Sequence, residues 1–272
     1  MQGPLFQKIR ACVSSPRLDI YRQPGDSDFD VIVRYLWNVQ LCEALYPSLQ
    51  ALEVAFRNSL HAAATGRFHS EFWFDPPPNR LARSEQADVT TAKADLGKQG
   101  KPLEVGRIIA ELTFGFWTSL LNTRYERVFW PWMLLPTFPG MPRHIRTRHT
   151  VSKRFNEIRA LRNRVFHHER IAHWPNLAQR HADLVEAIGW ISPEGKRLLP
   201  AIDRFAEVYA GAWTRSGSRS GESCTRKATP SNSRGTSAAR NRSSVKSRVA
   251  RTRFAGRPID DGGPPPRKRG SG

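Results

Sequence analysis

The sequence predicts an all-α protein: one helical domain followed by a basic tail. Apolar residues recur at the 3.6-residue period of an amphipathic helix in several long segments. Strand-like alternation never lasts more than a few residues, and there is no internal repeat. Large apolar residues end abruptly, because all eight Trp lie between Trp37 and Trp213 and only four large apolar residues follow, Val245, Val249, Phe254 and Ile259.

The N-terminal part should consist of a lead-in and a first helix. Residues 1–25 are rich in Pro, Gly and Ser, and we expect them to form a loose, flexible lead-in to a domain that spans residues 26–213. Ser27 or Asp28 can cap a first helix that reaches Leu45. The helical period predicts an apolar face made of Phe29, Ile32, Val33, Leu36 and Val39.

A Pro residue separates the first helix from the next. Tyr46-Pro47 is expected to break the first helix and to start a second one, which ends near Ala64, because Pro suits the first turn of a helix. Residues 66–79 form a predicted loop whose aromatic residues cover the edge of the core, namely Phe72, Trp73 and Phe74. A polar helix is expected over residues 80–98.

The second half of the domain is predicted to be helical as well. Residues 103–121 have a strong helical period and predict one helix. Residues 125–142 are aromatic and interrupted by Pro, which predicts a short helix and an irregular lid. Two helices, over about 176–191 and 193–213, complete the bundle. Before them, residues 144–168 form a long basic helix with one apolar stripe, Val151, Phe155, Ile158, Leu161 and Val165.

The formal charge of +19 is concentrated in the tail. Residues 214–272 hold 15 Lys and Arg residues against 3 acidic residues, a formal charge of +12, with frequent Ser, Gly and Pro. Such a segment cannot bury enough apolar surface to offset its conformational entropy, so we expect it to be disordered. The charge favours RNA or DNA as a partner, ahead of an anionic membrane. The alternative is a solubilising extension without a dedicated partner.

Cysteine usage and hydropathy predict a cytoplasmic protein without a membrane segment. Cys12, Cys42 and Cys224 are few and far apart, which argues against a disulfide framework. The N-terminus has no signal-peptide pattern, and no window approaches the ~18 consecutive apolar residues of a membrane span. No metal or other cofactor is expected, because ligand spacing is missing from the histidines considered, His144, His149, His167, His168 and His173.

The candidate site lies in residues 161–171, Leu-Arg-Asn-Arg-Val-Phe-His-His-Glu-Arg-Ile. Within this run, Arg162 and His167 form the pattern Arg-x4-His, with an Asn directly after the Arg. Two further blocks precede it. They are residues 52–61, Leu-Glu-Val-Ala-Phe-Arg-Asn-Ser-Leu-His, and residues 111–121, Glu-Leu-Thr-Phe-Gly-Phe-Trp-Thr-Ser-Leu-Leu.

These three blocks, in content and in order, resemble those of Abi-like proteins (the AbiD/AbiF group) of the HEPN superfamily. The resemblance covers about residues 25–213. The resemblance implies an HEPN-like helical bundle and a homodimer whose interface holds the motif. It also implies a metal-independent endoribonuclease that serves phage abortive infection, an antiviral defence, or a toxin–antitoxin system. In a toxin–antitoxin system, an antitoxin protein or RNA would be a further partner beside the RNA substrate.

The residue types suit cleavage of RNA without a metal. Attack by a 2′-OH on the adjacent phosphorus requires removal of the hydroxyl proton and protonation of the leaving 5′-oxygen, and histidine can do either near neutral pH. A planar Arg can hold the charge on the phosphoryl oxygens. We therefore assign acid–base catalysis to His167 and phosphate binding to Arg162, with Asn163 orienting one of them or contacting RNA. The residues expected to support the site or to contact RNA are His168, Glu53 and Arg57.

The spacing of the pair raises a geometric difficulty. Five residues on an ideal helix correspond to about 500°, so Arg162 and His167 would point some 140° apart. The two side chains can share a site only if the helix ends or bends there, or if two subunits meet across a two-fold axis. The homodimer that the resemblance implies corresponds to the second solution.

The same residues also have structural interpretations. Arg162 could be a half-buried partner of Glu53 or Glu169, and His168 could cap the C-terminus of a helix. Glu53 and Arg57 could form a structural pair, since buried charges need partners. The alternative functions are a non-catalytic RNA-binding module of the HEPN type and a dimerisation domain that the tail tethers to nucleic acid.

Overall fold

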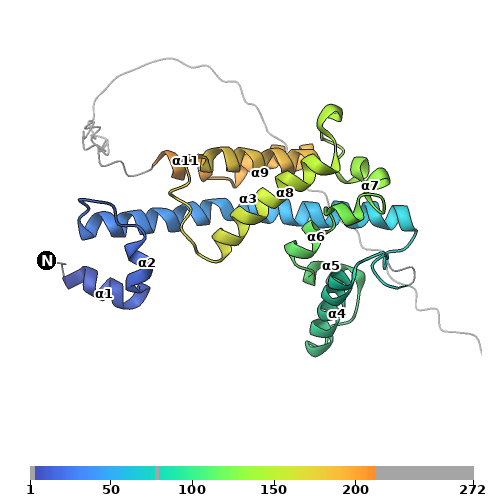
Figure 1. The fold of residues 1–272 in the computed structure, drawn as a ribbon, viewed down its shortest axis with the longest axis horizontal. Coiled ribbons are helices and arrows are strands. Elements are labelled where there is room, and N and C mark those ends of the chain that lie inside the picture. Colours follow the sequence, from blue (N-terminus) through green and yellow to red (C-terminus); the bar gives the residue numbers. More distant parts are fainter. Residues whose placement is uncertain (1–3, 77–79, 212–272) are drawn as a thin grey trace, which may run out of the picture. The chain divides into compact units, whose positions relative to one another are not determined.

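The computed structural model describes residues 4–76 and 80–211, and all regular elements in these ranges are helices (Figure 1). The predicted all-α class is therefore confirmed for this part of the chain. The predictions for residues 77–79 and 212–272, including the basic tail, lie outside the described residues. None of the described helices is both long enough and apolar enough to cross a bilayer.

The longest helix is α3 (Asp28–Phe68), with 41 residues. Ser27 caps it as predicted, because Ser27 Oγ accepts a hydrogen bond from the backbone N–H of Asp30 at 3.3 Å. In return, the Asp30 carboxylate accepts a hydrogen bond from the Ser27 N–H at 2.8 Å, which completes a capping box. The predicted break at Pro47 is wrong: the helix continues through it. Tertiary packing along α3 outweighs the backbone hydrogen bond that Pro47 cannot donate.

The N-terminal half of α3 buries only part of the predicted apolar face. Phe29, Leu36 and Val39 are 66%, 52% and 45% exposed, respectively, whereas Ile32 and Val33 are half-buried. The buried side includes the polar residues Asp30 and Asn38 beside its apolar residues. The prediction was therefore wrong for three of its five residues, because the buried face of this half of α3 also uses polar side chains that bind backbone groups.

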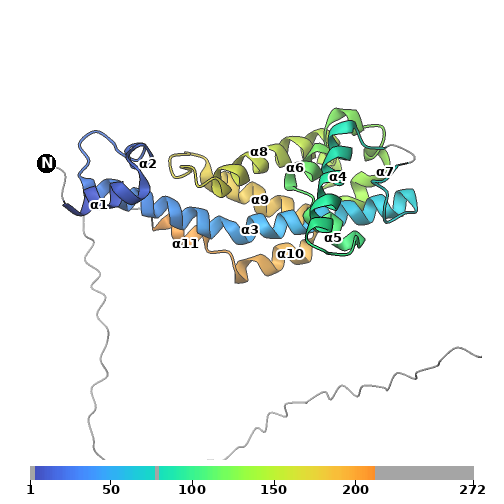
Figure 2. The ribbon, with the colours of Figure 1, turned by 90° about the horizontal axis from the view of Figure 1, so that it is seen from below.

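The other helices are arranged along α3, with α1 and α2 at its N-terminal end, α4 to α7 toward its C-terminal end, and α8 and α9 side by side along it (Figures 1 and 2). Their bounds are α1 (Pro4–Val13), α2 (Ser15–Asp19), α4 (Arg83–Lys98), α5 (Val105–Glu111), α6 (Phe114–Ser119), α7 (Trp130–Thr137), α8 (Arg148–Phe166), α9 (Leu177–Ile191), α10 (Pro193–Leu198) and α11 (Phe205–Ala210). Short 3-10 turns are found at Thr123–Tyr125, Arg143–Ile145 and Leu199–Ala201.

The lead-in is helical, so the expectation of a loose segment over residues 1–25 is wrong for its described part. It forms α1 and α2, and Pro16 occupies the first turn of α2, where a Pro is tolerated. The two helices share a small apolar cluster with the start of α3, made of Phe6, Leu18, Tyr21 and Val31. Burial of this cluster, which is separate from the main core, stabilises two helices too short to form alone.

Two predicted helices are divided. The helix expected over residues 103–121 consists of α5 and α6, because Thr113 is extended and its Oγ1 accepts a hydrogen bond from the Phe116 N–H at 3.2 Å. The helix expected over residues 193–213 is divided into α10 and α11 within its described part. The predicted helices at 80–98 and 144–168 are confirmed as α4 and α8.

Aromatic side chains fill the main core. Phe56 of α3 lies at its centre, with ring centroids 4.3 Å from Phe155 of α8 and 6.0 Å from Phe138. The segment predicted as an irregular lid is part of this core, because Trp130 and Phe138 are buried. Two of the three loop aromatics, Trp73 and Phe74, cover the edge of the core as predicted, whereas Phe72 is exposed. The predicted apolar stripe of α8 is buried throughout. The buried members are Trp73, Phe74, Val151, Phe155, Ile158, Leu161 and Val165.

Candidate functional site

Helix α8 ends between the two motif residues. Phe166 is its last residue and His167 its C-cap. His168 has φ 57°, a left-handed conformation that Gly usually adopts at this position after a helix. The N–H of Glu169 donates to the Arg164 carbonyl at 2.8 Å, and the N–H of His168 donates to the Val165 carbonyl at 3.1 Å. This hydrogen-bond pattern is a Schellman motif, so His168 has the C-terminal capping role that was one of its two interpretations.

Arg162 contacts α3 and the end of its own helix. Its Nε lies 3.6 Å from Oε2 of Glu53, and its guanidinium lies 4.3 Å from the centroid of the Phe166 ring. Of the two carboxylates that were predicted as partners of Arg162, Glu53 is the one that it contacts. Glu169 forms an ion pair with Arg164 instead. Both side chains are about one-quarter exposed, so the pair stabilises the fold only weakly.

Arg57 lies one turn along α3 from Glu53, but the predicted pair between them is not among the ion pairs of the described residues; Glu53 binds Arg162 instead. Arg57 is half-buried, and its Nε is buried. Within the described part of the chain, the Nε atoms of Arg57 and Arg162 have no hydrogen-bond partner. Each of these two guanidinium groups therefore keeps a buried donor that no described residue satisfies.

His167 lies in a different environment. Its side chain is exposed, and its backbone N–H donates to the carbonyl of Asn163 at 2.9 Å. It lines a cavity of about 420 Å³ together with Arg164 and Arg170. Among the described residues, no hydrogen bond or ion pair joins His167 to Arg162. Asn163 is exposed in the last turn of α8, near both.

Asn38, which sequence reasoning missed, holds the loop that follows the motif. Its side chain is buried, and its Oδ1 accepts hydrogen bonds from the N–H groups of Ile171 at 2.7 Å and Ala172 at 3.0 Å. Its Nδ2 donates to the Glu169 carbonyl at 3.3 Å. The buried residues Val31, Asn38, Leu45 and Leu52 recur at seven-residue intervals, a spacing that could have identified Asn38.

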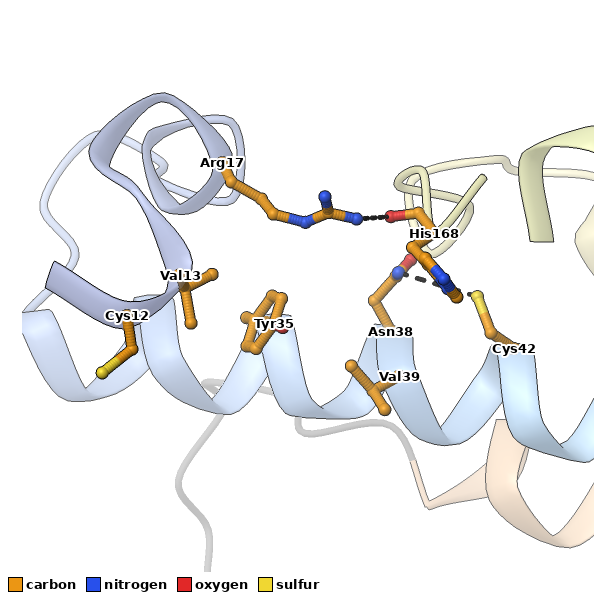
Figure 3. Close-up of a pocket in the computed structure, with 8 residues that line it drawn as sticks. All are labelled: Cys12, Val13, Arg17, Tyr35, Asn38, Val39, Cys42 and His168. Atoms are coloured by element: carbon orange, nitrogen blue, oxygen red, sulfur yellow. Dashed lines mark hydrogen bonds between the residues drawn. The ribbon is translucent and has the colours of Figure 1, made fainter. Parts of the chain in front are cut away.

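Arg17, in the segment that we expected to be a loose lead-in, also reaches the motif. Figure 3 shows its side chain extending from α2 to the loop after α8, where its Nη2 donates to the carbonyl of His168. The two residues bound a second cavity of about 400 Å³, which is also lined by Tyr35, Asn38 and Cys42 of α3 (Figure 3). Helix α2 therefore forms part of the candidate site.

The surroundings shift the pKa of two groups near the motif. Burial, together with the charges of Arg170 and Arg164, lowers the pKa of His173 from its usual value. Burial raises the pKa of the Cys42 thiol to about 11, so this thiol is protonated and unreactive at neutral pH. Both arginines therefore act in the same direction as burial and disfavour protonation of His173.

An apolar groove of about 510 Å³ also adjoins the motif, and it shares His168 with both cavities. Its lining includes Val39 and Tyr46 of α3, Phe166 of α8 and Ile202, all of them exposed. The rings of Tyr46 and Phe166 lie 5.6 Å apart. The Phe166 ring lines this groove and also contacts the Arg162 guanidinium, so the groove adjoins the motif.

Within the described ranges, no group of three or more His, Cys, Asp or Glu side chains converges as metal ligands. No model of a known protein family, no curated protein and no solved structure matches this chain.

Proposed function

We propose that the protein is a metal-independent endoribonuclease, the effector of phage abortive infection or of a toxin–antitoxin system, with Arg162 and His167 as its catalytic pair. The observation that carries the proposal is the end of α8 at Phe166. It leaves the imidazole of His167 exposed beside Arg164 and Arg170, and it places the half-buried guanidinium of Arg162 at the edge of an apolar groove.

In this mechanism, His167 takes the proton from the 2′-OH or delivers one to the leaving 5′-oxygen. Its exposure lets it reach a nucleic acid at the protein surface. Arg162 holds the phosphoryl oxygens with its two Nη groups, because its contact with Glu53 is made by Nε. Asn163, which is exposed, contacts RNA, and Arg57 supports the site from α3, one turn after Glu53.

The two catalytic side chains belong to different subunits in this proposal. In one chain Arg162 faces Glu53 and Phe166, whereas His167 faces the cavity with Arg164. A second copy seated on the apolar groove would bring its own motif next to the first across a two-fold axis. The groove suits this role because it exposes large apolar side chains and adjoins Arg162 through Phe166.

One observation favours the second candidate function, a non-catalytic RNA-binding module. Arg162 already has a partner in Glu53 and a stacking ring in Phe166, which are the contacts of a structural Arg. In that case the arginines and histidines of the loop bind RNA without cutting it. Product analysis separates the two functions.

The test is incubation of the purified full chain with total cellular RNA and an excess of chelator, followed by mapping of the cut ends. We expect cleavage that the chelator does not change, with 2′,3′-cyclic phosphate and 5′-OH ends, because 2′-OH attack produces these groups. His167→Ala and Arg162→Ala should each lower the cleavage rate by at least about a hundredfold while leaving the fold intact.

Matched controls come from the same helix. His149 is exposed in the first turn of α8, and Arg159 precedes Arg162 by about one turn. His149→Ala and Arg159→Ala should keep cleavage within about twofold of the wild-type rate, because neither residue is assigned a role in the site. RNA binding without any cleavage by the wild-type chain would support the second function instead, and full cleavage by folded His167→Ala would exclude the proposed mechanism.

A further inference from the structure

The cavity that His167 lines is strongly cationic. Three arginines contribute to it from three parts of the chain: Arg17 from α2, Arg164 from the last turn of α8, and Arg170 from the following loop. Three histidines, His167, His168 and His173, add further ring nitrogens, and Glu169 is the one acidic residue in its lining. We call this space the cationic cavity.

The arginines of the cationic cavity are held in place but not neutralised. Arg17 donates to the carbonyl of His168, and Arg170 donates to the carbonyl of Ile20. Among the described residues, neither Arg17 nor Arg170 forms an ion pair with a carboxylate. A guanidinium has five N–H donors, so each retains donors after its backbone contact, and the Nε of Arg170 is buried without a partner.

Glu169 neutralises one arginine of the cavity. Its Oε2 lies 2.9 Å from Nη1 of Arg164, and both side chains are nearly half exposed. Burial, with the charges of Arg170 and Arg164 acting in the same direction, lowers the pKa of His173 beside them. Such a cluster of like charges costs free energy in the unbound protein, which an anion would recover.

We propose that the cationic cavity binds a phosphate group, and that this group belongs to the RNA backbone next to the position acted on by His167. The assignment to RNA rests on the proposed function. Planar guanidinium groups and imidazoles match phosphate oxygens in geometry and charge, and about 420 Å³ accommodates one phosphate with its ordered water. Arg17 makes α2 part of this site, so the N-terminal helices have a role in binding.

Two probes test the proposal with the full chain: inorganic phosphate, and an RNA oligonucleotide with 2′-O-methyl groups at every position, which cannot be cut by 2′-OH attack. Arg170→Gln and Arg17→Gln should weaken the binding of each probe about tenfold or more. Arg180→Gln is the matched control. Arg180 stacks on Trp174, as Arg164 does, but it does not line the cavity, so binding should stay within about twofold.

Two measurements remain informative if the Arg variants fold poorly. Glu169→Gln removes the single acidic group of the lining and releases Arg164, so it should tighten phosphate binding severalfold, a result that misfolding cannot produce. Phosphate should also raise the pKa of His173 in an NMR titration of the wild-type chain, because an anion favours the imidazolium.

Unchanged binding of both probes by folded Arg170→Gln, with no response of His173, would overturn the proposal. Phosphate binding that depends on Arg170, combined with oligonucleotide binding that does not, would overturn the assignment to RNA. The methylated oligonucleotide measures binding alone, so failure of this proposal can be told apart from failure of the ribonuclease proposal. If only the ribonuclease proposal failed, the cavity would still bind RNA, and the wild-type protein would cut none.

Discussion

At the scale of single residues, Asn38 illustrates how a polar side chain in a helix can position a site elsewhere in the chain. Its amide makes three hydrogen bonds to the backbone of residues 169–172, which follow the motif directly. A helix end and a Schellman motif fix where α8 stops, but the direction of the next residues depends on Asn38. The place of His167 relative to Arg170 is therefore set from α3.

Asn38→Ala should destabilise the protein and impair the site. The substitution leaves the buried N–H groups of Ile171 and Ala172 without an acceptor, which should lower the free energy of unfolding by about 2–3 kcal/mol in urea denaturation. RNA binding should weaken as well, because Arg170 and His173 lose their fixed positions. Asn58→Ala, at an exposed position of the same helix, is the control and should change stability by less than about 0.5 kcal/mol. Equal stability of the two variants would contradict the assigned role of Asn38.

At the scale of elements, α3 contains Pro47 in its interior, where the backbone lacks one donor to the carbonyl of Glu43. Pro47→Ala should restore that hydrogen bond and raise the free energy of unfolding by about 1–2 kcal/mol, after allowance for the freedom that Ala gains in the unfolded chain. The measurement is again urea denaturation. Pro193→Ala, at the first position of α10, should give no such gain, because that N–H would have no partner in the helix anyway. A destabilised Pro47→Ala would instead show that the packing of the Pro47 ring contributes more than the restored hydrogen bond.

The helices were predictable where one apolar stripe faces one core, and less so elsewhere. α8 follows this rule, with its stripe from Val151 to Val165 fully buried, so its existence and orientation follow from the 3.6-residue period. In the first half of α3 the rule reverses, because Asn38 occupies the buried face and Phe29 the exposed one. α1 and α2 are short and cluster with Val31, a tertiary contact that composition does not reveal.

The candidate site likewise contains residues that the sequence predicted and residues that only the fold reveals. Arg162 and His167 stand in one sequence motif, and their types indicate the chemistry. Arg17 and Asn38 are more than 120 residues from the motif, and only folding brings them to it. Their contacts are to backbone carbonyl and N–H groups, which carry no signature in the sequence. Local sequence therefore predicts the reacting groups, whereas the residues that position them depend on the tertiary structure.

At the scale of the whole molecule, the proposed dimer makes a quantitative prediction. If each site takes Arg162 from one subunit and His167 from the other, a heterodimer of Arg162→Ala and His167→Ala contains one intact site and one doubly inactive site. Co-expressed one to one, the two chains should recover about a quarter of wild-type cleavage, since half of the dimers are mixed. Each variant alone should be inactive. No recovery, with dimers confirmed by sedimentation, would place the pair within one chain.

The apolar groove supplies the control for this experiment. Tyr46→Glu puts a charge in the groove and should give monomers that recover no activity on mixing. Leu103→Glu changes a residue that is equally exposed but lies outside the groove, and it should leave both the dimer and the recovery intact. Dimers that persist in Tyr46→Glu would show that the subunits meet on another face.

The tail prediction follows from charge alone. Residues 214–272 hold 15 basic and 3 acidic residues, so removing them takes away most of the chain's formal charge of +19. Each phosphate that the tail neutralises contributes about 0.7 to the slope of log K against log salt for single-stranded RNA, without regard to base sequence. Truncation after Thr214 should therefore weaken RNA binding at low salt and flatten this slope, while the rate of cleavage at saturating RNA stays unchanged. A full-length chain with Gln in place of the tail's Lys and Arg residues separates charge from length and should behave like the truncated chain. If the truncated chain bound RNA with the same affinity and the same slope, the tail would be a solubilising extension, and the folded domain would account for all phosphate contacts.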